Sequence, residues 1–143
     1  MGECVFCDIA SGKKDALILY SDEFIISIMD HRPINKGHVL VTPKKHYRDI
    51  FEVPADILCK ATEVTRRVSI AINSTYHPMG LNIIENNGTD AGQTVFHFHI
   101  HLIPRYDSKY NTELAKVAWH RKVISPEELK KTRDEILKNM NIP

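Results

Sequence analysis

The chain has 143 residues, of which 43% are hydrophobic and 26% are charged, a composition that is ordinary for one globular domain with its own core. Nineteen Lys and Arg residues nearly balance eighteen Asp and Glu residues, which excludes the basic footprint of a nucleic-acid-binding protein and leaves a nucleotide-sized ligand open. The N-terminus shows no signal segment, and no apolar run approaches the ~18 residues that span a bilayer, so we expect a cytoplasmic protein without membrane contact.

Three short runs rich in Ile, Val, Leu and Phe come first, and their bounding Asp, Asn, Pro and Gly residues are typical of strands. They cover residues 16–20, 24–29 and 38–42. In the next segment, residues 54–76, apolar residues recur at helical spacing behind Pro54, a favourable residue for the first turn of a helix. The apolar stripe of this helix is Ile57, Leu58, Ala61, Val64, Val68, Ala71 and Ile72, and Cys59 is expected with it in the core.

Two further strands are predicted at residues 81–85 and 95–103, and a second helix begins at the capping box that starts with Ser125. Leu129, Arg133, Ile136 and Met140 follow on one stripe of that helix. Five strands, one long intervening helix and one C-terminal helix predict an α+β domain. We expect a five-stranded, mostly antiparallel sheet with helices on one side.

The run HFHIHLIP places a histidine at every second position of the last predicted strand. Alternate residues of a strand share one face, so His97, His99 and His101 should point one way. The intervening residues, which should point into the core, are Phe96, Phe98, Ile100 and Leu102. A lone histidine would more often be a half-buried, hydrogen-bonded strand residue, but three in register on a buried strand favour a functional surface.

Alternate side chains leave a strand about 6.5 to 7 Å apart, so three histidines would strain to bind one ion. Cys4 and Cys7 offer two soft ligands at a loop spacing that zinc favours. His97, the histidine nearest the loop, and His46 would complete a closed and therefore structural tetrahedral site. A redox pair of cysteines has the same spacing but normally opens a helix in a βαβ unit, which this segment does not resemble, and buried cysteines are a further alternative.

Two stretches, GHVLVTPKKH and NGTDAGQTVFHFHIHLIPR, resemble the histidine triad family of nucleotide hydrolases and transferases. The defining pattern of that family, His-φ-His-φ-His-φ-φ with φ apolar, is matched at every position from His97 to Ile103. The resemblance extends from about Cys4 to Arg105. It implies one domain over residues 1–143, with 107–143 as a C-terminal extension.

The resemblance implies that His99 is the nucleophile, which attacks the α-phosphorus of a nucleotide and is then released by water. Neutral imidazole suits this step, and its other ring nitrogen needs an acceptor, such as a backbone carbonyl, that fixes the tautomer. His101 would stabilise charge on the phosphate, and His97 would be a zinc ligand. The loop before the triad, which lacks the ending of a P-loop, would bring Gln93 and Thr94 to the reacting phosphate.

The nucleotide contacts that the resemblance implies are Phe6, Leu19 and Ile28 around a purine base, Asp30 on the ribose hydroxyls, and Asn86, Gly92, Gln93, Thr94, His99 and His101 near the phosphates. From the residues alone, Asp30 would be a strand-end turn residue, the three apolar residues would be core, and the glycine loop would be a tight hairpin.

Three functions stay open on this evidence: a hydrolase that releases AMP from phosphoramidates, acyl adenylates or dinucleoside polyphosphates; a nucleotidyltransferase or phosphorylase; and a zinc-stabilised nucleotide-binding scaffold. The resemblance also implies a homodimer whose two sheets join, with the long helix across the two-fold axis. The apolar stripe of residues 54–76 could contribute to that interface or serve only as a core face. Trp119 is a candidate to reach the partner's pocket, although a helix follows it.

Overall fold

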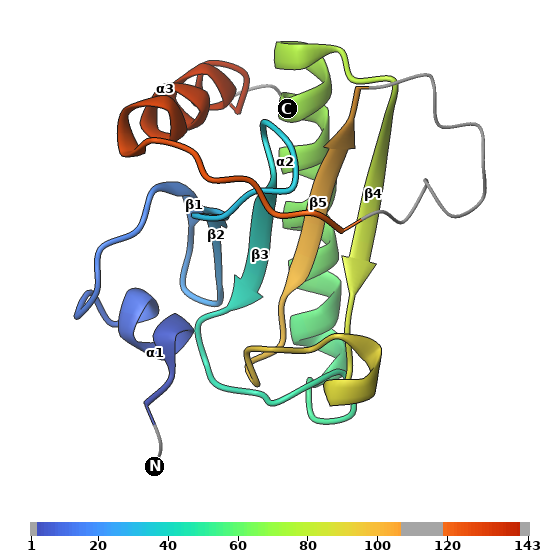
Figure 1. The fold of residues 1–143 in the computed structure, drawn as a ribbon. Helices are drawn as coiled ribbons and strands as arrows, with labels where there is room; N and C mark the ends of the chain where they lie inside the picture. Colours follow the sequence, from blue (N-terminus) through green and yellow to red (C-terminus); the bar gives the residue numbers. More distant parts are fainter. Residues whose placement is uncertain (1–2, 107–118, 141–143) are drawn as a thin grey trace.

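The computed structural model describes residues 3–106 and 119–140. Its centre is a five-stranded sheet in the order β1-β2-β3-β5-β4, and each neighbouring pair is antiparallel, which confirms the predicted α+β class (Figure 1). The strands are β1 (Ile18–Ser21), β2 (Ile25–Met29), β3 (Val39–Pro43), β4 (Gly80–Glu85) and β5 (Ile100–Arg105). The helices are α1 (Val5–Ala10), α2 (Ala55–Tyr76), α3 (Pro126–Leu137) and the short 3-10 helix η1 (Thr89–Ala91).

One face of the sheet is covered by α2, which runs along the strands, and α3 joins the same core from the side (Figure 1). The sheet contributes alternate residues to this core, including Ile25 and Met29 of β2 and Ile100 and Leu102 of β5, because successive side chains of a strand point to opposite faces. The α2 residues that are buried against them are Ile57, Ala61, Val64, Thr65, Val68, Ala71 and Ile72. The predicted stripe of α2 is therefore a core face.

Helix α2 differs from the prediction at two residues. Pro54 is its N-cap rather than a member of its first turn, and Cys59 is exposed rather than in the core. Cys59 lies between Ile57 and Ala61, which both face the sheet, so the 100° step of the helix turns its side chain away from that face. No helix among the described residues combines the length and the apolar character that crossing a membrane requires.

Helix α3 begins as its sequence predicts. Ser125 is the N-cap, its hydroxyl oxygen accepts a hydrogen bond from the N–H of Glu128 at 3.1 Å, and Pro126 occupies the first turn. Leu129, Ile136 and Met140 are buried in the same core as the apolar face of α2.

The opposite face of the sheet bears a second, smaller cluster in which Phe6 of α1 packs on Ile26, Ile28 and Leu40. Helix α1 was not predicted, since the two cysteines were expected in a loop. Cys4 is its N-cap, and the N–H of Cys7 points at the Cys4 sulfur at 3.5 Å. The helix thus sets the spacing of the two thiols on the face that also holds the histidines.

The last strand begins at Ile100 rather than at residue 95, so only His101 of the triad lies within it. The β3–β5 register would place Phe98 opposite Pro43, and proline has no N–H to continue the ladder. The Thr42 hydroxyl donates instead to the Phe98 carbonyl at 2.7 Å, and the Phe98 N–H donates to Tyr47 at 2.7 Å. Phe96, predicted in the core, lies in the resulting bend and is 44% exposed.

Candidate functional site

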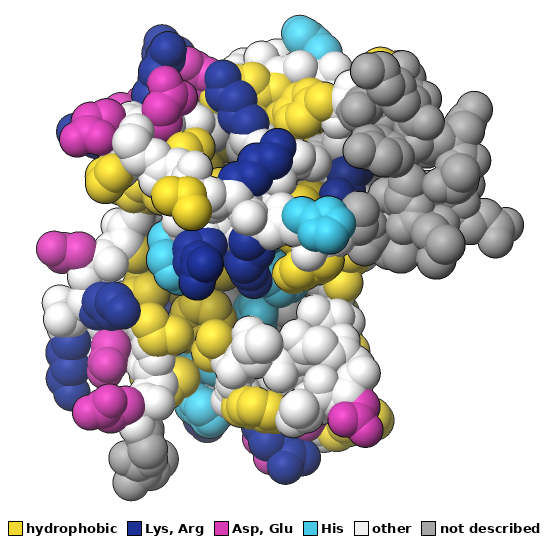
Figure 2. Space-filling view, in the orientation of Figure 1, with side chains coloured by type: hydrophobic (Ala, Val, Ile, Leu, Met, Phe, Trp, Pro, Cys, Tyr) yellow, Lys and Arg dark blue, Asp and Glu magenta, His cyan; other side chains and the backbone are white. Residues whose placement is uncertain are grey.

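A cavity of about 570 Å³ opens on the sheet face opposite α2, between α1 and the strands (Figure 2). Its floor and one wall are apolar, with Phe6, Ile28 and Leu40 among the lining residues. Its polar lining consists of Lys14, Asp15, Asp30, His31, Arg32, Thr94, His99, His101 and Arg121. An apolar pocket with a few convergent polar groups is the usual form of a small-molecule site.

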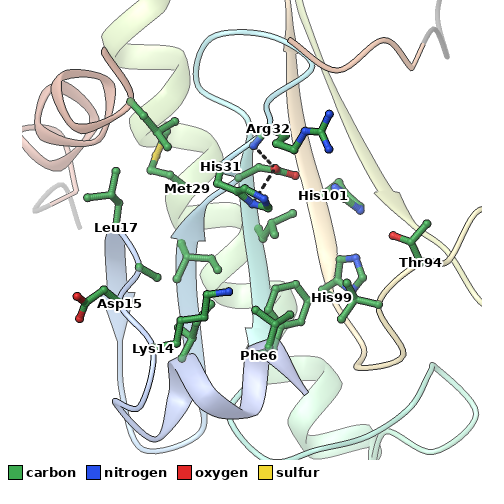
Figure 3. A pocket seen from close by; sticks show the side chains of 18 of the residues that line it. Phe6, Lys14, Asp15, Leu17, Met29, His31, Arg32, Thr94, His99 and His101 are labelled. Atoms are coloured by element: carbon green, nitrogen blue, oxygen red, sulfur yellow. Dashed lines mark hydrogen bonds and ion pairs between the residues drawn. The ribbon is translucent and has the colours of Figure 1, made fainter. Parts of the chain in front are cut away.

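His99 is held in one tautomer inside this cavity. Its Nδ1 lies 2.7 Å from the carbonyl oxygen of His97, an acceptor, so Nδ1 bears the proton and Nε2 keeps its lone pair. Burial lowers the pKa of His99, which favours the neutral ring. The ring lies beside His101, with centroids 4.9 Å apart, and Phe6 contacts it edge-on (Figure 3). The unprotonated Nε2 is therefore available as a nucleophile.

A chain of hydrogen bonds orients His101 through His38, a residue that the sequence did not single out. The N–H of Ile34 donates to His38 Nδ1 at 3.0 Å, so His38 Nε2 bears the proton and donates to His101 Nδ1 at 2.9 Å. Neutral His101 then carries its own proton on Nε2, the donor left for a ligand. Burial lowers the pKa of His38 to about 4 and that of His101 well below its usual value, so both rings are neutral at pH 7.

Sequence signals for His38 existed but were indirect. The β3–β5 register pairs Leu40 with His101, and His38 lies two residues before Leu40, on the same face of the sheet. Only the pairing of two strands that are distant in sequence reveals this proximity.

Asp30 directly follows β2, is almost fully buried and lines the cavity, and its role at the ribose stays a prediction. Its Oδ1 accepts the N–H of Arg32 at 2.9 Å, and its Oδ2 lies 3.5 Å from His38 Nε2. Arg121, which the sequence analysis did not identify, donates from Nη1 to both carboxylate oxygens, at 3.2 and 3.0 Å. Trp119 packs edge-on against His101 of its own chain, with ring centroids 4.8 Å apart.

Of the loop residues that were predicted to reach the phosphate, Thr94 lines the cavity, whereas Asn86, Gly92 and Gln93 do not. The Gln93 side chain is buried in the loop itself: its oxygen accepts from the Gly88 N–H at 2.7 Å and its amide donates to the Arg48 carbonyl at 2.7 Å. Gln93 therefore braces the loop and positions Thr94. Gly92 adopts the left-handed conformation, at φ 91°, that closes η1.

The apolar wall contains Phe6 and Ile28 as predicted, but not Leu19, which is buried on the α2 side of the sheet. The pairing of β1 with β2 shifts register between Ile18 and Tyr20, so Leu19 lies in a β-bulge. The base contact that the resemblance implies for Leu19 is therefore not part of this cavity, and Leu19 is a core residue, as its apolar character alone predicts. Leu17 lines the cavity in its place (Figure 3).

A second constellation lies beside the cavity, where Cys4, Cys7, His46 and His97 bring four ligand atoms within 4.8 Å of one another. The sulfur-to-Nδ1 distances are 3.3 Å for Cys4 and His97, 3.5 Å for Cys7 and His97, and 3.4 Å for Cys7 and His46. Ligands of a tetrahedral zinc ion with these atom types are separated by about 3.5 Å. These three distances and the two-thiol, two-imidazole donor set therefore fit a zinc site.

The far nitrogen of His97 supports the same assignment. Its Nε2–H donates to the Pro43 carbonyl at 2.7 Å, which leaves Nδ1 unprotonated and directed at the two sulfurs. Burial, followed by the neighbouring Cys4 thiol, raises the pKa of Cys7 to about 11, so this thiol is protonated at pH 7 unless a cation displaces its proton.

Comparisons with known proteins agree with this geometry. Residues 11–108 match the family model described as HIT domain. Protein hit of Bacillus subtilis is 34% identical over 137 residues, which are 96% of this chain and 94% of that protein. The adenylylsulfatase HINT3 of Arabidopsis thaliana is 39% identical over 103 residues, which are 72% of this chain and 52% of that protein. The crystal structure of a zinc-bound histidine triad family protein from Mycobacterium smegmatis superposes with a TM-score of 0.78 at 34% identity, covering 95% of this chain and 94% of that one. The chain therefore belongs to the HIT family.

Proposed function

We propose that this protein hydrolyses purine nucleoside 5'-phosphate derivatives through a nucleotidyl-histidine intermediate on His99. The observation that supports it most directly is the hydrogen bond from His99 Nδ1 to the His97 carbonyl, which leaves a neutral, unprotonated Nε2 inside a nucleotide-sized cavity. A structural histidine would not need its free nitrogen to face an open pocket. The arrangement is the one that nucleophilic catalysis requires, because the attacking atom is uncharged and its tautomer is fixed.

In the first step, the His99 Nε2 lone pair would form a bond to the α-phosphorus as the bond from phosphorus to the leaving group breaks. The leaving group departs with that electron pair and, where it is an amine, takes up a proton from solvent. The His101 Nε2–H and the Thr94 hydroxyl would donate hydrogen bonds to the phosphate oxygens, where negative charge accumulates. In the second step, water attacks phosphorus and loses a proton to solvent, the bond to Nε2 breaks with its electron pair returning to nitrogen, and a nucleoside monophosphate is released with neutral His99 restored.

We also propose that the protein binds a structural zinc ion through Cys4, Cys7, His46 and His97. Zinc at this site would cross-link three parts of the chain: the start of α1, the segment after β3 that holds His46, and the segment before β5 that holds His97. Those residues hold the His97 carbonyl, which is the acceptor for His99, so the metal would keep the nucleophile in place without contact to substrate. The spacing of the four ligand atoms and the zinc-bound relative support this proposal.

The nucleotide half of the substrate would lie with its base between Phe6 and Ile28 and its ribose hydroxyls at Asp30, all of which line the cavity. The similarity to an adenylylsulfatase supports adenosine as the nucleoside. Phosphoramidates, acyl adenylates, adenylyl sulfate and dinucleoside polyphosphates all present an α-phosphate with a departing group, so each is a candidate substrate.

Replacement of the nucleophile tests the proposed function. His99→Ala should lose roughly 10³-fold or more of the rate of AMP release from adenosine phosphoramidate, while AMP binding changes little, because the covalent step alone is removed. His120→Ala, which removes an exposed histidine, is the matched control. Denaturation of the wild-type protein at alkaline pH during turnover, which preserves the P–N bond, should trap AMP on His99, seen by peptide mass spectrometry. A rate within tenfold of wild type for His99→Ala would contradict the mechanism.

We further propose that the protein is a cytoplasmic homodimer joined along β4. This strand is an edge of the sheet, and Ile83 on it is 55% exposed. An edge strand with exposed apolar side chains is a favourable surface for isologous pairing. The stripe on α2, considered earlier for this role, is buried against the sheet instead.

A further inference from the structure

The carboxylate of Asp30 is already occupied in the structure. Arg121 Nη1 lies 3.0 Å from Oδ2 and 3.2 Å from Oδ1, and the same nitrogen donates to the Arg32 carbonyl at 2.8 Å. The Asp30 side chain is only 4% exposed, and its other neighbours are the Arg32 N–H, His38 Nε2 at 3.5 Å and His31 Nδ1 at 4.0 Å. A cis-diol that binds Asp30 from the cavity therefore meets the guanidinium of Arg121 first.

Binding of a ribose at Asp30 would change the ion pairing of Arg121. If ribose hydroxyls cap Asp30, Arg121 loses a buried carboxylate partner and gains none from the neutral sugar. A guanidinium that is left without an anion in a partly buried position is unfavourable, so it will pair with the nearest available negative group. The substrate itself can supply that group, because the leaving group is bonded to the phosphorus that His99 would attack, and His99 and Arg121 line the same cavity.

Resting on the proposed function, we propose that Arg121 is a specificity-determining residue that leaves Asp30 when the nucleotide binds and pairs with an anionic leaving group. The substrates favoured by this exchange carry a phosphate chain or a sulfate on the α-phosphate. Substrates whose leaving group is a neutral amine gain nothing from it.

The residues on either side of Arg121 hold it close to the reacting groups. On one side, Trp119 packs against His101 and lies 5.6 Å from the Arg121 guanidinium. On the other side, the Lys122 N–H donates to the Pro33 carbonyl at 2.7 Å. The segment before α3 thereby crosses the sheet in front of β5 and β3 (Figure 1).

The positive charge of Arg121 affects the pKa of a histidine in the cavity. Burial lowers the pKa of His101, and the positive charge of Arg121 lowers it further. Arg32 and Lys14 also line the cavity, and Figure 2 shows Lys and Arg side chains gathered around its opening. The mouth of the pocket thus offers cations to an anionic group, whereas its floor and one wall are apolar.

The test compares three substrates on one protein preparation: adenosine phosphosulfate and diadenosine tetraphosphate, whose leaving groups are anionic, and adenosine phosphoramidate, whose leaving group is an amine. AMP release gives kcat/KM for each. Arg121→Ala should lower kcat/KM for the two anionic substrates by about tenfold or more relative to the phosphoramidate. Because the three values come from the same sample, the folded fraction cancels from their ratios.

Lys122→Ala is the matched control, since it removes a cation from the same segment whose Nζ contacts Asn35 rather than Asp30, and its ratios should equal those of wild type. Arg121→Lys retains the charge and should recover part of the preference for anionic substrates. An equal loss on all three substrates, or no loss in Arg121→Ala, would overturn the inference while leaving the hydrolase intact. A wild-type protein that releases AMP from none of them would overturn the proposed function and the inference with it.

Discussion

Acid should destabilise this protein through His38 by an amount that the structure allows us to calculate. His38 is fully buried, and its pKa falls from 6.5 to about 4 because burial disfavours the charged ring. Between these two pH values the unfolded chain binds a proton that the folded chain does not, so stability is complete above pH 6.5 and falls as the pH falls toward 4. At about 1.4 kcal/mol for each pH unit, the loss between pH 6.5 and pH 5 is about 2 kcal/mol.

The measurement is urea unfolding of wild type and His38→Gln at pH 7 and pH 5. Glutamine can accept the Ile34 N–H and donate to His101, but it does not titrate, so its stability should fall by about 2 kcal/mol less than that of wild type over this range. The remaining titrating groups are common to both proteins and cancel in the comparison. His31→Gln, which removes a histidine whose side chain is 86% exposed, should retain the wild-type pH dependence. An identical pH dependence in wild type and His38→Gln would refute the reasoning.

Two further predictions concern the metal and the assembly. Metal analysis of the purified protein should find about one zinc per chain. Cys7→Ser should lower the melting temperature more than Cys59→Ser, because the Cys59 thiol is exposed and outside the ligand cluster. Metal-free protein that melts like the metal-bound form would contradict the zinc site. Sedimentation at micromolar concentration should give twice the 16.4 kDa chain mass, and Ile83→Lys at the β4 edge should shift it to the monomer. A wild-type species at 16.4 kDa would exclude the dimer.

The sequence by itself determined the features that depend on local order along the chain. Apolar residues at periods of two and of about 3.6 predicted the five strands, α2 and α3, and Ser125 predicted the start of α3, because these signals arise within one element. The row of histidines and the two cysteines likewise predicted a site on one face, since the residue types suited to nucleophilic attack and to zinc are few. The family resemblance added the roles of individual residues, which stay predictions.

Only the tertiary structure decided which distant residues meet. His38 reaches His101 across 63 positions and Arg121 reaches Asp30 across 91, and neither contact leaves a local pattern. Register had the same effect, because Pro43 opposite Phe98 delays the start of β5 to Ile100. Strand pairing and the path of the segment before α3 depend on the packing of the whole chain, so the orientation of His101 and the partner of Asp30 could be read only from the folded molecule.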